Sequence, residues 1–147
     1  MGVKVAEVMS TAVEFIDGTA PAKEAAELMG ELDVGALPVG NAGALDGIVT
    51  DRDLLFRVVA AGLDPNTALV RDVASRSVIA CRDTDDLRVA MDLMAANQIR
   101  RLPVMDDRGA VCGWVTLADI SRKLLVDSRD LQGALSRITE TDGASDS

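Results

Sequence analysis

Histidine and tyrosine are both absent from this chain of 147 residues. The absence of histidine excludes a Ser-His-Asp triad and a histidine general base, and it removes the commonest protein ligand for metal ions. The remaining sequence shows no nucleophile-base pair, phosphate-binding glycine-rich loop or cluster of metal ligands. We therefore expect a protein that is not an enzyme and that requires no cofactor.

Aromatic residues and cysteines are also scarce. Two Phe and one Trp are the only aromatic side chains, so the core must be built from aliphatic residues. The two cysteines, Cys81 and Cys112, fit no zinc or CxxC spacing and lie in apolar stretches. We expect two buried, reduced thiols, with a disulfide or a redox role as the alternative.

Positive charge and long apolar runs are lacking as well. The chain has 15 Lys and Arg against 24 Asp and Glu, which gives a net charge of −9. Nucleic-acid binding that does not depend on sequence needs a basic surface, so no nucleic-acid partner is expected. No apolar run approaches the ~20 residues of a membrane span, and the first ten residues lack the apolar segment of a signal peptide. The expected location is therefore cytoplasmic, with no membrane partner.

What the sequence does contain is an internal repeat. Three segments recur with one common offset: VAEVMS at 5–10 matches VRDVAS at 70–75, AAELM at 25–29 matches AMDLM at 90–94, and ALPV at 36–39 matches RLPV at 101–104. After one further residue in the next turn, the pattern Gly-x-x-Thr-x-x-Asp also recurs, as Gly47, Thr50 and Asp53 and then as Gly113, Thr116 and Asp119. A period of this length identifies the repeating structural unit.

Each copy predicts the element order β-α-β-β-α. A short strand (12–16 or 77–81) precedes a helix with an apolar stripe, and a hairpin and a second helix follow. One such unit is too small to bury its sheet alone, so we expect an α/β (α+β) fold in which two β-α-β-β-α motifs pack with pseudo-two-fold symmetry. The expected motifs span residues 5–66 and 70–127, with two equivalent clefts between them. Residues 128–147 are expected to form a C-terminal helix and a disordered tail.

The repeated Gly-x-x-Thr-x-x-Asp motif has two interpretations. Each threonine lies where a strand ends and a helix begins, and such a helix start attracts anions. The Thr hydroxyl could donate to a phosphate, the Asp carboxylate could accept from ribose hydroxyls, and the Gly would let a ligand approach the backbone. The same Thr-x-x-Asp spacing also matches a capping box, in which the two side chains satisfy the helix-start N–H groups.

Arginines occur near the predicted clefts. Arg100 and Arg101 begin a strand of the second copy, and Arg52 directly precedes Asp53. Guanidinium groups at these positions would balance the charge of a bound phosphate. The alternative for each is an ordinary solvated surface arginine.

The duplicated pattern LPV…G.VT..D resembles the cystathionine-β-synthase (CBS) domain, present here as a tandem pair. The chain is also similar to small stand-alone bacterial CBS-pair proteins of the hypoxic-response type. The resemblance implies a Bateman module that binds adenosine-containing ligands such as AMP, ADP or ATP in the clefts between the motifs. It also implies a homodimer.

The same resemblance implies roles for individual residues. Asp53 and Asp119 would hold ribose hydroxyls, and Thr50 and Thr116 would contact phosphate. Segments that precede the first strand of each copy would complete the site of the other copy: Ser10, Thr11 and Ala12 for the Asp119 site, and Ser75, Arg76 and Ser77 for the Asp53 site. The copies differ, because Ala118 replaces Arg52, and Gly35 and Ala36 stand where Arg100 and Arg101 stand. We expect the two clefts to bind with unequal affinity.

The sequence therefore predicts a regulatory module that senses adenine nucleotides and signals through a dimer to an unidentified protein effector. The alternative is a dimeric adaptor that binds no nucleotide, in which the Thr-x-x-Asp motifs serve only as helix caps.

Overall fold

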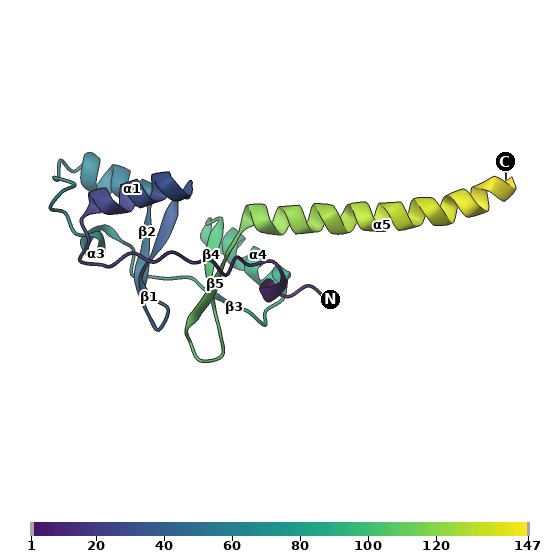
Figure 1. The fold of residues 1–147 in the computed structure, drawn as a ribbon, viewed down its shortest axis with the longest axis horizontal. Helices are drawn as coiled ribbons and strands as arrows, with labels where there is room; N and C mark the ends of the chain where they lie inside the picture. Colours follow the sequence, from purple (N-terminus) through teal and green to yellow (C-terminus); the bar gives the residue numbers. More distant parts are fainter. Residues whose placement is uncertain (1, 147) are drawn as a thin grey trace.

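The computed structural model describes residues 2–146, with side chains described except at residue 131 and from residue 137 onward. Its elements are η1 (Val5–Glu7), α1 (Ala22–Leu32), β1 (Ala36–Asn41), β2 (Ala44–Thr50), α2 (Asp51–Leu54), η2 (Leu55–Val59), α3 (Val70–Val73), β3 (Cys81–Arg82), α4 (Leu87–Asn97), β4 (Arg101–Met105), β5 (Val111–Thr116) and α5 (Leu117–Asp146). Two lobes of strands and helices lie side by side, and α5 extends away from them (Figure 1). The α/β class with two related motifs is confirmed.

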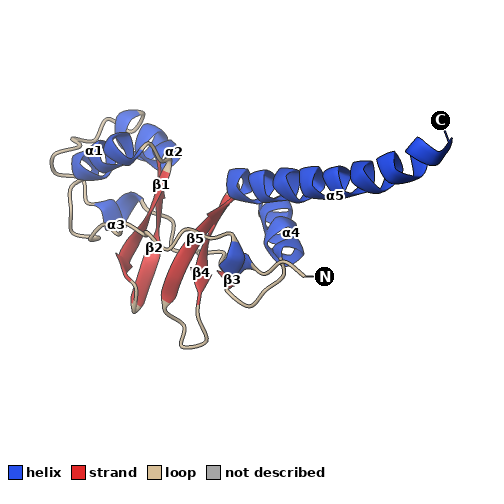
Figure 2. Cartoon of the chain, turned by 45° about the vertical axis from the view of Figure 1, so that its right-hand side comes forward, coloured by secondary structure: helices blue, strands red, loops and turns tan. Residues whose placement is uncertain are grey.

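Both predicted hairpins form. Strand β1 pairs with β2 in antiparallel register, and β4 pairs with β5 in the same way. The two prolines occupy matching places, since Pro38 lies opposite Ile48 and Pro103 opposite Trp114. Helices α2 and α5 begin directly where β2 and β5 end (Figure 2). The turn from strand to helix that carries each Thr-x-x-Asp motif is therefore built twice.

The strand expected at the start of each copy is much shorter than predicted. In the first copy only Ile16 pairs, through an isolated bridge to Val39. In the second copy β3 contains only two residues, parallel to β4. Residues 12–14 line a cavity instead of extending the sheet.

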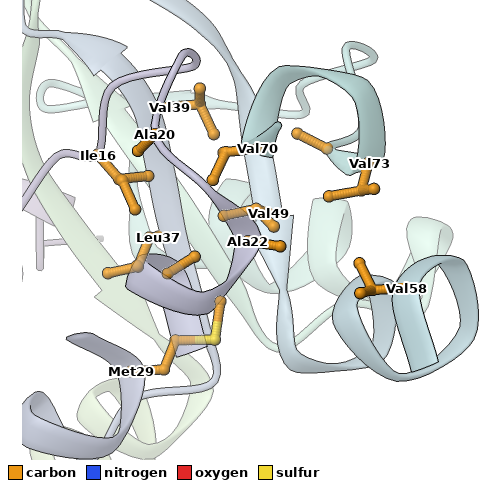
Figure 3. Packing of buried hydrophobic residues seen from close by; sticks show 12 residues of the cluster. Ile16, Ala20, Ala22, Met29, Leu37, Val39, Val49, Val58, Val70 and Val73 are labelled. Atoms are coloured by element: carbon orange, nitrogen blue, oxygen red, sulfur yellow. The ribbon is translucent and has the colours of Figure 1, made fainter. Parts of the chain in front are cut away.

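The two lobes exchange the segments that precede each repeat. Val5 belongs to the core of the second lobe, with Leu102 and Val115, and its N–H donates to the Asp85 carbonyl at 2.8 Å. In the counterpart, Val70 and Val73 of α3 pack into the core of the first lobe, beside Val49 of β2 (Figure 3). Each repeat therefore supplies part of the core of the other.

Helix α5 differs from the expectation for residues 128–147. The structure has one continuous helix from Leu117 to Asp146, where the sequence suggested a separate helix and a disordered tail. This stretch contains no proline, and an isolated glycine lowers the stability of a helix without ending it. Within residues 2–146, no helix combines the length and the apolar character needed to cross a bilayer.

Candidate ligand-binding cleft

A cleft of about 670 Å³ combines residues of both repeats, and we call it the Asp119 cleft. Its lining comes from the N-terminal segment, the loop before β1, the start of β4, the end of β5 and the first turn of α5. The residues are Ser10, Ala12, Asp33, Val34, Gly35, Ala36, Arg100, Arg101, Trp114, Thr116, Leu117, Ala118, Asp119 and Ser121. Ser10 and Ala12 line the same cleft as Asp119. They are held there because Ser10 and Trp114 exchange backbone hydrogen bonds of 2.8 and 2.9 Å.

Thr116 and Asp119 form a capping box at the start of α5. The Asp119 N–H donates to the Thr116 hydroxyl oxygen at 3.1 Å, and the Thr116 N–H donates to Oδ2 of Asp119 at 3.1 Å. The other carboxylate oxygen of Asp119 accepts from the exposed guanidinium of Arg122. The capping role and a ligand role are compatible, because the Thr116 hydroxyl accepts in the cap and keeps its own proton to donate.

The first copy has the same local geometry. The Asp53 N–H donates to the Thr50 hydroxyl oxygen at 3.0 Å, and the Thr50 N–H donates to Oδ2 of Asp53 at 2.9 Å. Oδ1 of Asp53 lies 3.9 Å from the guanidinium of Arg57. In both copies, mutual hydrogen bonds therefore hold the threonine and the aspartate in place without the help of a ligand.

Arg101 lies against the other repeat. A Cβ at Gly35 would come within 2.8 Å of Nη1 of Arg101 and 3.0 Å of Oδ2 of Asp51. The missing side chain at Gly35 therefore leaves the space in which the guanidinium of Arg101 sits. Arg100 is exposed, and its carbonyl accepts from the Leu117 N–H at 2.7 Å, which ties the start of β4 to the start of α5. Two positive side chains thus lie on the wall of the Asp119 cleft.

An apolar pocket of about 240 Å³ adjoins the Asp119 cleft. Its lining residues are Ala12, Val13, Glu14, Leu32, Val34, Ala36, Leu37, Pro38 and Trp114. Ala12, Val34, Ala36 and Trp114 line both cavities. Our sequence analysis did not identify Trp114 or Val34. The signal available for Trp114 was its position two residues before Thr116 on the same strand, which places both side chains on one face.

The other predicted residues lie outside the Asp119 cleft. Arg52 sits over the ring of Phe56, with 5.3 Å between its guanidinium carbon and the ring centre. Ser75 pairs through its backbone with Ile48, and Ser77 is exposed. Arg76 lines a separate polar pocket of about 320 Å³ together with Asp17, Thr19, Asp46 and Arg71. Thr11 is exposed between Ser10 and Ala12 and is not among the lining residues.

The glycines of the repeated motif have a different role from the one expected. A Cβ at Gly47 would lie 2.5 Å from the carbonyl oxygen of Ser75, and a Cβ at Gly113 would meet the Met9 side chain and lie 3.0 Å from the carbonyl oxygen of Ser10. The expectation that these glycines admit a ligand is corrected, since the chain itself occupies the space. They allow the exchanged segments to cross the hairpins.

Both cysteines are free thiols. Cys81 is buried, and this burial raises the pKa of its thiol to about 12. Cys112 is only partly buried, and desolvation raises the pKa of its thiol as well. Among the residues with described side chains, no group of three or more acidic or cysteine side chains is placed to hold a metal ion.

Comparison with known proteins identifies the family. The model of the CBS domain family matches residues 5–60 and 70–126 of this chain. Hypoxic response protein 1 of Mycobacterium tuberculosis is 37% identical over 119 residues, covering 80% of this chain and 82% of that protein. CBS domain-containing protein YhcV of Bacillus subtilis is 39% identical over 117 residues, again covering 80% and 82%. The crystal structure of Arabidopsis thaliana CBSX2 in complex with AMP aligns with a TM-score of 0.74 at 27% identity, covering 86% of this chain and 99% of that one.

Proposed function

Because this chain belongs to the CBS domain family and carries two copies of the domain, we propose that it is a regulatory module that binds an adenine nucleotide in the Asp119 cleft. The observation that carries the proposal is the meeting of Thr116, Asp119 and the two guanidinium-bearing residues Arg100 and Arg101 in one cleft of about 670 Å³. The ligand class is AMP, ADP or ATP, and CBSX2 is a structural neighbour with AMP bound.

The chemistry of the cleft supports a nucleoside phosphate. Arg100 and Arg101 supply charge and N–H donors for phosphate oxygens, and the Thr116 hydroxyl retains its proton as a further donor. The start of the long helix α5 adds a favourable partial charge for an anion. Oδ1 of Asp119, which the exposed Arg122 contacts, is the acceptor for a ribose hydroxyl, because an exposed arginine can move aside at little cost.

The two copies of the motif are not equivalent in this proposal. Where Arg100 and Arg101 contribute to the Asp119 cleft, the first copy has Gly35 and Ala36. The guanidinium of Arg101 already lies against Gly35. Because the first copy lacks arginines at the positions equivalent to Arg100 and Arg101, the proposal assigns the stronger nucleotide binding to the Asp119 cleft.

A second candidate function is an adaptor that binds no nucleotide. The observation in its favour is the capping box itself, since in both copies the threonine and the aspartate hydrogen-bond each other's backbone N–H at the helix start, at 2.9 to 3.1 Å. Under this candidate the repeated motif stabilises α2 and α5 and has no other role.

The proposal also includes a cytoplasmic homodimer that transmits nucleotide occupancy to a protein effector, with no catalytic step. The support for an interface is an apolar surface on η2 and the turn after it, the η2 surface. Leu55, Phe56, Val59 and Leu63 are each between 49% and 70% exposed there. Apolar side chains gathered on one face are typical of a protein-protein contact.

The test is a calorimetric titration of nucleotide-free protein with AMP, ADP, ATP and S-adenosylmethionine, using Asp119→Asn and Asp53→Asn as matched variants. Each variant weakens one capping box, so both should melt at a lower temperature. Only Asp119→Asn should weaken nucleotide binding, by roughly tenfold or more for a lost charged hydrogen bond. The adaptor candidate stands instead if no nucleotide binds the wild type and both variants merely melt earlier.

A further inference from the structure

Trp114 is the single tryptophan of the chain, and its surroundings set it apart from the core. On β5 the residues Val111, Gly113 and Val115 are buried, whereas Cys112, Trp114 and Thr116 lie on the opposite face and are only partly buried. Trp114 belongs to neither of the two cores. Its indole instead lines both the Asp119 cleft and the apolar pocket beside it.

The backbone of Trp114 is fixed on both sides. Its amide and carbonyl exchange hydrogen bonds with Ser10, and Pro103 lies opposite it on β4. The side chain therefore projects from a strand that is held at two edges. A ligand that contacts the ring therefore needs to order little additional backbone.

The spacing between Trp114 and Thr116 matches the shape of a nucleotide. Residues two apart on a strand point to the same face and lie about 6.6 to 6.8 Å apart. A ribose separates the base of a nucleotide from its phosphate by a similar length. If the phosphate lies at Thr116 and Arg101, the base lies one such step away, at Trp114 and the apolar pocket.

The cavities that Trp114 lines also offer apolar side chains suited to the second face of a planar base. Val34 lines both cavities and is 41% exposed, and Leu32 in the apolar pocket is 39% exposed. A flat ring inserted between the indole and these side chains would cover apolar surface that is otherwise wet. Stacking on an aromatic ring accepts any base and is strongest for the larger ring system of a purine.

From these observations we propose that Trp114 stacks on the base of the bound nucleotide and sets the preference of the Asp119 cleft for purines. This inference rests on the proposed nucleotide-binding function and adds the residue that recognises the base. The counterpart of Trp114 in the first copy is Ile48. The stacking wall is thus a second difference between the copies, independent of the arginines.

The chain offers a direct readout, because with one Trp and no Tyr its fluorescence under selective excitation of tryptophan comes from Trp114 alone. AMP should quench this emission as it binds. Ribose 5-phosphate, which has the same sugar and phosphate without the base, should bind more weakly and leave the emission nearly unchanged. CMP should bind more weakly than AMP.

Two variants separate stacking from a structural effect. Trp114→Ile copies the residue of the first repeat and should weaken AMP binding by about 5- to 150-fold, as expected for the loss of one base-aromatic stack. The affinity for ribose 5-phosphate should stay unchanged in the same variant. Trp114→Phe retains an aromatic face and should preserve most of the affinity for AMP. Circular dichroism and melting curves establish that both variants are folded.

The outcomes distinguish this inference from the function on which it rests. If the wild type binds AMP in an Asp119-dependent way, yet Trp114→Ile binds AMP equally well, the stacking role is wrong and the nucleotide function stands. The stacking role is also wrong if Trp114→Ile weakens AMP and ribose 5-phosphate to the same extent. If the wild type binds none of these ligands, the proposed function and the stacking role both fail.

Discussion

At the scale of single residues, the hydroxyl group of each motif threonine has two separate capacities. Its oxygen accepts the N–H of Asp53 or Asp119 in the capping box, at 3.0 and 3.1 Å. Its proton takes no part in that bond and can be donated elsewhere. The two threonines differ in what lies beyond them, because Thr116 lines the Asp119 cleft and Thr50 does not. A matched pair of substitutions therefore separates capping from binding.

Thr50→Val and Thr116→Val should each lower the free energy of unfolding by about 0.5–2 kcal/mol, since each removes one cap acceptor while keeping the shape of the side chain. Only Thr116→Val should also weaken AMP binding. Urea unfolding measures the first effect, and tryptophan fluorescence titration measures the second. Equal loss of AMP affinity in both variants would contradict the assignment of the ligand to the Asp119 cleft.

The buried thiol of Cys81 makes the free energy of unfolding vary with pH in the alkaline range. Burial raises the pKa of its thiol from 9.0 to about 12, so between these values the thiol is ionised in the unfolded chain and neutral in the folded one. The unfolded state then binds fewer protons, and the free energy of unfolding falls as pH rises through this window. Cys81→Ala should flatten that decline. Urea unfolding at pH 8, 9 and 10, normalised to each protein's value at pH 8, tests this, and parallel profiles would show that Cys81 is not the group involved.

At the scale of elements, the crossing of the exchanged segments over the hairpins explains the repeated glycines. The backbone of Ser75 passes β2 at Ile48, with two hydrogen bonds of 2.9 Å, and this brings its carbonyl oxygen over Gly47. Ser10 passes β5 at Trp114 in the same way. A side chain at either glycine would push the crossing segment away from the sheet. The glycine is thus a requirement of the fold.

Gly47→Ala should destabilise the protein by about 1–3 kcal/mol, the usual cost of forcing atoms into a packed site, because the new Cβ would lie 2.5 Å from a backbone oxygen that cannot rotate away. Gly43→Ala is the matched control. Its new Cβ would meet only the Asn41 side chain, at an ordinary 3.6 Å. Thermal melting should therefore separate the two variants, and equal melting temperatures would mean that the crossing is looser than the structure indicates.

The same elements show which parts of the structure the sequence could predict. Hairpins and helices follow from local patterns, so the periodic apolar residues of α1 and the glycine-, asparagine- and aspartate-containing turns between the paired strands predicted them. The exchange of η1 and α3 between lobes does not follow, because Val5 and Val70 have the same pattern whichever lobe buries them. In the site, the spacing of Thr116 and Asp119 was readable from the repeat. Trp114 was readable in the same way, from its place two residues before Thr116 on one strand, although we did not identify it. Val34 was not, since it joins this site only when the two lobes pack.

At the scale of the whole molecule, the approximate symmetry of the repeat is broken in the same sense at several positions. Arg100, Arg101 and Trp114 in the second copy correspond to Gly35, Ala36 and Ile48 in the first. Each of these three differences adds charge or aromatic surface to the Asp119 cleft, whereas the change from Arg52 to Ala118 removes a charge. A chain that binds in this way has one strong site, so the calorimetric stoichiometry in the titrations above should be one nucleotide per chain.

The proposed dimer also belongs to this scale, and the chain offers a matched test of where it forms. Leu55 on the η2 surface is 55% exposed, and Leu135 on the distal part of α5 is 52% exposed. Because the two leucines are similarly exposed, changing either to lysine should have little effect on the stability of a monomer. Leu55→Lys should place an unpaired charge in the interface and shift the mass measured by light scattering toward a monomer, while Leu135→Lys should leave it unchanged. Dissociation by Leu135→Lys instead would move the interface to α5, and a monomeric wild type would exclude signalling through a dimer altogether.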